Sequence, residues 1–138
     1  MDISEVVDLA LRGKRVFQDD LLRKADETGW SVAHELSVRR KLPVDFVDWD
    51  IADNTGYTVA HSAAFLGTLP ESFDHFHLAD ENGSTIAHIL ARRLDWERLS
   101  RVPKEVLSMR NSQGKTPVDV IKQIGNAEID RLKKLLGE

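Results

Sequence analysis

The sequence predicts an all-α fold, a solenoid of about four to five stacked helix-turn-helix repeats with capping helices at its ends. The main observation is a nine-residue phrase that occurs three times, as DETGWSVAH, DNTGYTVAH and DENGSTIAH, ending at residues 34, 61 and 88. The copies are therefore 27 residues apart, and a divergent fourth copy, NSQGKTPVDV, follows them. Such a fixed period indicates one supersecondary unit built several times, because a single unit cannot bury its apolar face alone.

Each phrase combines a turn with the start of a helix. Its Asp-x-x-Gly pattern supplies a carboxylate that can bond nearby backbone N–H groups, followed by a residue that tolerates a positive φ. The glycines of the four copies are Gly29, Gly56, Gly83 and Gly114. Two residues after each glycine stands a hydroxyl side chain that is suited to capping a helix. These capping residues are Ser31, Thr58, Thr85 and Thr116, and Pro117 fits the first position of the last helix.

Proline marks the second part of each unit. Pro43, Pro70 and Pro103 are expected to open a second helical piece of one or two turns. The apolar residues three positions later are expected to face the core, and they are Phe46, Phe73 and Val106. The repeat divides the chain, taken as one domain over 1–138, into units of approximately 1–25, 26–52, 53–79, 80–110 and 111–138.

Both ends of the chain carry a helical pattern. Asp2 and Glu5 form a capping-box-like start. The apolar stripe that follows consists of Ile3, Val6, Val7, Ala10 and Leu11, and a second stripe near the C-terminus consists of Ile129, Leu132, Leu135 and Leu136. Both helices are expected to cap the stack, because terminal units need a polar outer face to end it and keep it in solution.

Composition limits the classes of protein. The 138 residues include no cysteine, which excludes disulfides, thiolate metal sites and cysteine nucleophiles and is compatible with a reducing compartment. No apolar run approaches the ~20 residues of a transmembrane helix, and acids precede the first apolar residues, the wrong charge order for a signal peptide. We therefore expect a cytoplasmic protein without a membrane partner. The net charge of −4 argues against a general nucleic-acid binder.

The repeated phrase resembles the ankyrin repeat. DNTGYTVAHSAAFLG, residues 53–67, is similar to the family pattern D-x-x-G-x-T-P-L-H-x-A-A-x-x-G, with Val-Ala in place of Pro-Leu, and QGKTPVDVIKQIGN resembles a last repeat. The resemblance covers residues 4–126. The family unit has about 33 residues, and the six missing here follow Gly67, so we expect shortened or 3₁₀-like outer helices. Between His88 and Pro103 the third unit is six residues longer, which predicts either a helix restored toward full length or a functional loop.

The three histidines of the phrase raise the question of a metal site. Zinc binds imidazole nitrogen at about 2.0–2.1 Å, whereas equivalent positions in stacked helices lie about 8–10 Å apart. His34, His61 and His88 therefore cannot share one ion and are interpreted as structural. The ankyrin resemblance implies that each bonds its Ser or Thr hydroxyl and the backbone of an adjacent turn, with a neutral ring.

Residues outside the phrase offer little for catalysis. His75 and His77 with Asp74 could form a weak metal site, but a solvated outer turn is favoured. The sequence has no Gly-rich phosphate loop, G-x-S-x-G, H-E-x-x-H or paired-carboxylate arrangement. We expect that the protein is not an enzyme and that it binds no cofactor and no metal. The alternative is an enzyme that uses His75, His77 and Asp74.

The expected site is a surface. Partners of ankyrin repeats usually contact the turn tips and one face of the first helices, which implies an apolar patch and two flanking arginines here: Trp30, Tyr57, Phe65 and Leu66, with Arg39 and Arg92. Aromatic and Arg clusters are typical of binding hot spots, and a contiguous exposed apolar patch usually marks an interface. The alternative is that Trp30 and Tyr57 pack on neighbouring turns.

These observations predict a non-enzymatic protein–protein interaction module, acting as an adapter, scaffold or inhibitor, that binds a protein partner as a monomer or weak homo-oligomer. A bacterial or phage-encoded inhibitor of a host enzyme is one form of this role. The alternative from another class is a nucleic-acid-associated regulator that uses Arg39, Arg40, Arg92 and Arg93. It requires binding that weakens steeply with salt.

Overall fold

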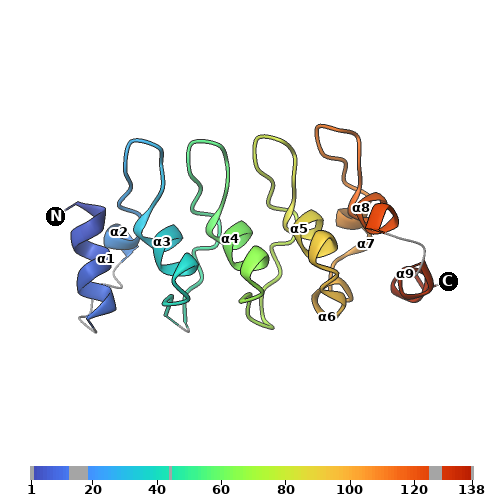
Figure 1. Ribbon diagram of the computed structural model, residues 1–138, viewed down its shortest axis with the longest axis horizontal. Helices are drawn as coiled ribbons and strands as arrows, with labels where there is room; N and C mark the ends of the chain where they lie inside the picture. The colour runs from blue at the N-terminus through green and yellow to red at the C-terminus, as the bar shows by residue number, and fades with distance from the viewer. Residues whose placement is uncertain (1, 13–18, 44, 125–128, 138) are drawn as a thin grey trace.

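The computed structural model describes residues 2–12, 19–43, 45–124 and 129–137. In these ranges the secondary structure is helical and contains no strand (Figure 1). The helices are α1 (Ile3–Leu11), α2 (Asp19–Leu22), α3 (Val32–Val38), α4 (Val59–Leu66), α5 (Ile86–Arg93), α6 (Trp96–Leu99), α7 (Lys104–Leu107), α8 (Pro117–Ile124) and α9 (Ile129–Leu135). None of the described helices is long and apolar enough to span a membrane.

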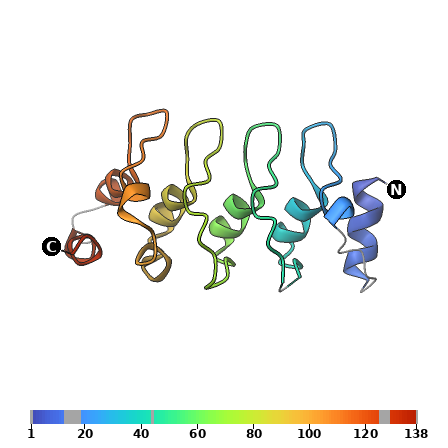
Figure 2. The same ribbon diagram turned by 180° about the vertical axis from the view of Figure 1, so that it is seen from behind.

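The helices α3, α4, α5 and α8 follow one another along the long axis of the molecule (Figures 1 and 2). A long loop precedes each of them, and all four loops extend to the same side. The helices α1 and α9 lie at the two ends of the row, so the chain termini are far apart. Within the first three loops single β-bridges close the base, pairing Ala25 with Ser31, Ala52 with Thr58 and Ala79 with Thr85.

Local sequence explains where the helices begin. The hydroxyls of Ser31, Thr58 and Thr85 each accept the N–H of the histidine three residues on, and that histidine ring faces the N–H of its own capping residue. In the last unit Thr116 and Asp119 form the same reciprocal pair, at 3.1 and 3.0 Å. These bonds occupy the orphan N–H groups of each first turn.

The outer parts of the units correct one expectation. Pro43 and Pro70 do not open helices; each is followed by a single turn in which the carbonyl oxygen of the proline accepts a bond, from Phe46 N–H and Phe73 N–H respectively, both at 3.1 Å. Of these three prolines only Pro103 opens a helical piece, α7. Chain length after the proline is not the reason, because Pro103 lies closer in sequence to Asn111 than Pro43 and Pro70 lie to Asp53 and Asp80. The added residues of the unit with α7 precede Pro103 and form α6.

A row of aromatic rings fills the space beside these turns. Phe46 meets Trp49 edge to face with ring centroids 4.9 Å apart, Trp49 meets Phe73 at 5.7 Å, and Phe73 meets Phe76 at 5.2 Å. All four side chains are buried. Phe46, Phe73 and Val106 thus face the core as expected, and edge-to-face contact adds to the energy of burying their area.

The terminal helices bury one face each. At the N-terminus Val6 and Val7 are buried, whereas Leu11 is exposed, and the Asp2 carboxylate accepts the N–H of Glu5 at 2.9 Å. At the C-terminus Leu132 is buried against the same core, while the side chain of Ile129 lies outside the described residues.

Candidate functional site

The tips of the four loops are held by one side chain each. The carboxylate of Asp53 accepts the N–H of Thr55 at 2.8 Å, the Thr55 hydroxyl at 2.7 Å and the N–H of Tyr57 at 3.0 Å. Partial burial acts to raise the pKa of Asp53, but these hydrogen bonds together hold it below its ordinary value. Asp26 has the equivalent partners, and its bond from the Thr28 hydroxyl is the main cause of its lowered pKa.

Neighbouring tips are also bonded to one another through the backbone. Asn54 N–H donates to the carbonyl oxygen of Thr28 at 2.9 Å, and Glu81 N–H donates to that of Thr55 at 2.8 Å. A third bond joins Ser112 N–H to the carbonyl oxygen of Asn82, also at 2.8 Å. The four tips, residues 26–30, 53–57, 80–84 and 111–115, therefore form one continuous bonded row.

The repeated histidines tie each helix to the loop of the following unit. Nδ1 of His34, His61 and His88 lies 2.7, 2.7 and 2.8 Å from its capping hydroxyl. Nε2 of each ring lies 2.8 Å from a carbonyl oxygen of the next loop, those of Tyr57, Ser84 and Lys115. All three rings are fully buried, and burial lowers the pKa of each. The three histidine side chains therefore connect each unit to the next.

Trp30 and Tyr57 lie against this histidine row and are each about half-buried. The Trp30 ring is 4.6 Å from His34 and 6.3 Å from Tyr57, and Tyr57 is 5.3 Å from His61. The indole N–H of Trp30 donates to Glu35 at 3.2 Å. The two rings therefore contribute to packing and also present one side to solvent.

Phe65 stands apart from these two rings, because no aromatic pair among the described residues joins it to them. Its side chain is 63% exposed, and Val38, at the equivalent position of α3, is 46% exposed. Leu66 is half-buried. Around α3 and α4 the named apolar side chains thus form two groups, a stacked pair at the tips and two exposed side chains at the helix ends, and Val47 is also exposed on an outer turn.

Most of the named arginines have partners within the chain. Arg39 pairs with Glu35 at 2.8 Å. Arg40 and Arg93 donate to the carbonyl oxygens of Leu66 and Phe65, at the C-terminal end of α4. Lysine and arginine are favoured at such helix ends, where carbonyls lack partners. Arg92 is exposed and lines a polar cavity of about 290 Å³ between the last two tips.

The outer histidines do not gather a metal-ligand set. His75 Nε2 lies 3.3 Å from Asp74, both side chains are exposed, and the ring of His77 is 6.2 Å from that of His75. Across the ranges that the structure describes, no three His, Asp or Glu side chains form a group able to hold an ion.

Sequence reasoning missed two features. The hydroxyl of Ser84 is buried without a partner in the described part of the chain, at the tip position that holds Trp30 and Tyr57 in earlier units. A pocket also opens between the turns after Pro43 and Pro70. In the sequence, the one feature that sets this region apart is Arg40, which stands where the next unit has Gly67.

In comparisons with known proteins, no family model matches the chain and no curated protein matches it.

Proposed function

We propose that this chain is a non-enzymatic protein-interaction module with an ankyrin-like solenoid architecture. Its partner is one protein, bound by the tip face, which we define as the four tips together with the exposed side of α3, α4, α5 and α8. The observation that carries the proposal is the bonded row of tips, together with two exposed apolar side chains at the ends of α3 and α4, Val38 and Phe65.

A rigid tip row favours tight association. Every tip is bonded internally by Asp or Asn and externally by a neighbouring tip, so its backbone loses little freedom when a partner binds. Surfaces that are organised before binding lose less conformational entropy on association, which leaves more of the contact energy as affinity. The hydrogen bonds that are the same in each unit build the scaffold, and the side chains that differ are available for recognition.

The differing side chains divide the tip face into two halves. At one tip position the successive units carry Trp30, Tyr57, Ser84 and Lys115, and at one helix position Val38, Phe65 and Arg92. The first half is therefore aromatic and apolar, and the second half is polar and cationic. A partner that matches it presents an apolar cluster beside a carboxylate-bearing segment, and aromatic and Arg side chains are enriched among hot spots.

Exposed residues allow a test that leaves the core intact. We expect a partner captured from a lysate by the wild type to be lost when Val38→Glu and Phe65→Glu are combined, because both introduce charge into the apolar half. Val47→Glu is the matched control, since Val47 is 74% exposed on an outer turn. Equal capture by all three proteins would place the site elsewhere, and equal thermal unfolding would show that the fold is unchanged.

The nucleic-acid alternative depends on arginines that are largely engaged inside the chain. Arg39, Arg40 and Arg93 all have carboxylate or carbonyl partners, so phosphate binding would have to replace these bonds. Capture that persists unchanged when salt is raised supports the protein partner, because phosphate contacts weaken steeply with salt.

A further inference from the structure

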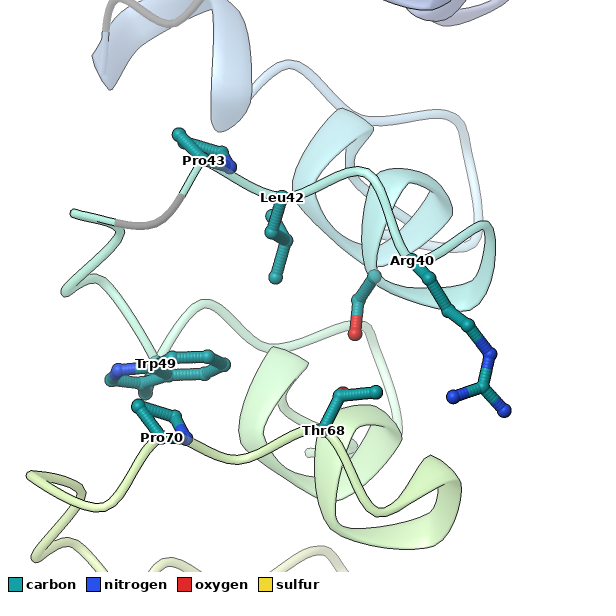
Figure 3. Close-up of a pocket in the computed structure, with 7 residues that line it drawn as sticks. Arg40, Leu42, Pro43, Trp49, Thr68 and Pro70 are labelled. Carbon is teal, nitrogen blue, oxygen red and sulfur yellow. The ribbon is translucent and has the colours of Figure 1, made fainter.

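A pocket of about 350 Å³ lies between the turn after Pro43 and the turn at Pro70, on the side of the molecule opposite the tips (Figures 1 and 3). Leu42, Trp49 and Pro70 line it; in Figure 3 Trp49 and Pro70 lie next to each other, and Leu42 points toward them from the other turn. Pockets of roughly 300 Å³ and above are large enough to bury small ligands. The pocket is separate from the tip face and does not depend on the function proposed for it.

The apolar walls are fixed in place. Trp49 is only 8% exposed, and its ring is held edge to face between Phe46 and Phe73. The two prolines have their φ angles set by their own rings. The pocket is therefore organised before any ligand arrives, as small-molecule sites usually are.

One polar group in the pocket has no partner. The Ser37 side chain lines it and is 2% exposed, yet its hydroxyl makes no hydrogen bond to any residue that the structure describes. A buried hydroxyl without a partner is destabilising, and such groups are rare enough in native proteins to require an explanation. A ligand that accepts or donates a hydrogen bond at this point would supply the missing partner.

Arg40 adds a cation at the edge of the pocket, and in Figure 3 its side chain points away from Trp49 and Leu42. Its φ is 60°, in the left-handed region, where the next unit has Gly67 with φ 75°. Glycine is the usual residue at this position after a helix, because it has no Cβ to strain the backbone. Arg40 thus occupies a position at which glycine would be more stable. The one hydrogen bond of its side chain among the described residues, to the carbonyl oxygen of Leu66, is long at 3.4 Å, so the exposed side chain can reorient.

Ser37 and Arg40 belong to one turn, because the N–H of Arg40 donates to the carbonyl oxygen of Ser37 at 3.0 Å. We propose that the pocket binds a small molecule that carries one carboxylate and a flat apolar ring. The ring lies between Leu42, Trp49 and Pro70, and the carboxylate accepts the Ser37 hydroxyl and a guanidinium N–H of Arg40. Charge-assisted bonds of this kind are the stronger ones.

Phenylacetate is a suitable probe, with phenylacetamide as its uncharged analogue. We titrate the isotope-labelled full chain with each and follow the indole N–H resonance of Trp49, assigned by its loss in Trp49→Phe. We expect a saturable shift with phenylacetate. Arg40→Gly should weaken binding roughly tenfold or more by removing a charged partner, while the backbone strain falls and the fold is kept.

Leu94→Gly is the matched control, because Leu94 holds the same left-handed position after α5, with φ 55°, and does not line the pocket. It should bind phenylacetate as the wild type does. Ser37→Ala should weaken binding while raising thermal stability, a combination that a purely structural role would not give. No saturable shift at Trp49, equal affinity for the amide, or unchanged binding by Arg40→Gly would overturn the proposal.

Discussion

The Nε2 atom of His61 lies 2.8 Å from the carbonyl oxygen of Ser84, which belongs to the loop of the following unit. A carbonyl only accepts hydrogen bonds, so Nε2 carries the ring proton. Nδ1 is then free to accept, and it receives the N–H of Thr58 at 3.1 Å and the Thr58 hydroxyl at 2.7 Å. One neutral ring therefore satisfies groups in two units, and this bonding requires that it stay neutral.

Replacing this ring by a methyl group should lower stability. In His61→Ala the carbonyl oxygen of Ser84 and the N–H of Thr58 lose a partner in a buried place, so we expect the free energy of unfolding to fall by about 1–3 kcal/mol. Urea unfolding measures this loss of free energy. His77→Ala, at an exposed outer turn, is the control and should change stability by less than about 0.5 kcal/mol. A loss of only a few tenths for His61→Ala would contradict the structural role.

The free energy of unfolding should also decrease as pH is lowered through the range where histidine titrates. Burial lowers the pKa of His34, His61 and His88 below the ordinary 6.5, although nearby Asp53 and Asp80 act to raise that of His61. Below about pH 6.5 the unfolded chain binds protons that the folded chain excludes, so stability is complete above that pH and is lost as pH falls. Each histidine contributes up to about 1.4 kcal/mol per pH unit.

The dependence of stability on pH can be assigned to the histidines by removing one of the three rings. We expect urea unfolding of the wild type between about pH 7.5 and pH 5 to show this loss, and His61→Gln to show about two thirds of the slope, because two of the three rings remain. Lowered carboxyl pKa values, such as those of Asp26 and Asp53, affect stability only at more acidic pH. A wild-type stability that is flat over this range would mean that the rings accept protons in the folded state.

Local rules account for what the sequence predicted well. Asp53, Gly56 and Thr58 lie within six residues, and their turn, positive φ and cap need no distant contact. The helices after each phrase could therefore be placed from the sequence. The outer pieces could not, because Pro43, Pro70 and Pro103 stand in similar local sequence, and yet only Pro103 is followed by a helix.

The candidate site was harder to predict for a related reason. Trp30 and Tyr57 are placed by contacts with the histidine rings, so the extent of their exposure is decided by neighbouring units. The pocket beside Trp49 needs two turns from different units, and the missing partner of Ser37 is visible only once those turns are in place. Such features arise from stacking, which a reading of one unit does not contain.

The turn glycines should differ in their tolerance of a side chain. Gly56 and Gly114 both have positive φ, 80° and 75°, so alanine is strained at either position by about 1 kcal/mol. A Cβ on Gly56 would also lie 3.1 Å from the Cα of Asp80 in the next tip, whereas a Cβ on Gly114 would meet nothing within 4 Å. Gly56→Ala should therefore lower the thermal midpoint clearly more than Gly114→Ala does. Equal losses would show that the close approach of the tips is not a constraint.

Arg98 of the inserted helix α6 should be the residue through which the insertion supports the preceding unit. Its guanidinium donates to the carbonyl oxygen of Leu69 at 2.6 Å and that of Gly67 at 3.2 Å, and it pairs with Asp95 at 2.8 Å in a largely buried place. Arg98→Met keeps much of the aliphatic stem but leaves these acceptors without a donor. We expect it to lower the free energy of unfolding by about 1–3 kcal/mol.

Arg101→Met is the matched control for this change. Arg101 is exposed and donates only to the carbonyl oxygen of Glu71 among the described residues, so its loss should be within about 0.5 kcal/mol in urea unfolding. Equal effects of the two substitutions would mean that the insertion does not hold the turn before Pro70. The support given by α6 would then come from its buried Leu99, which belongs to the core cluster, and not from Arg98.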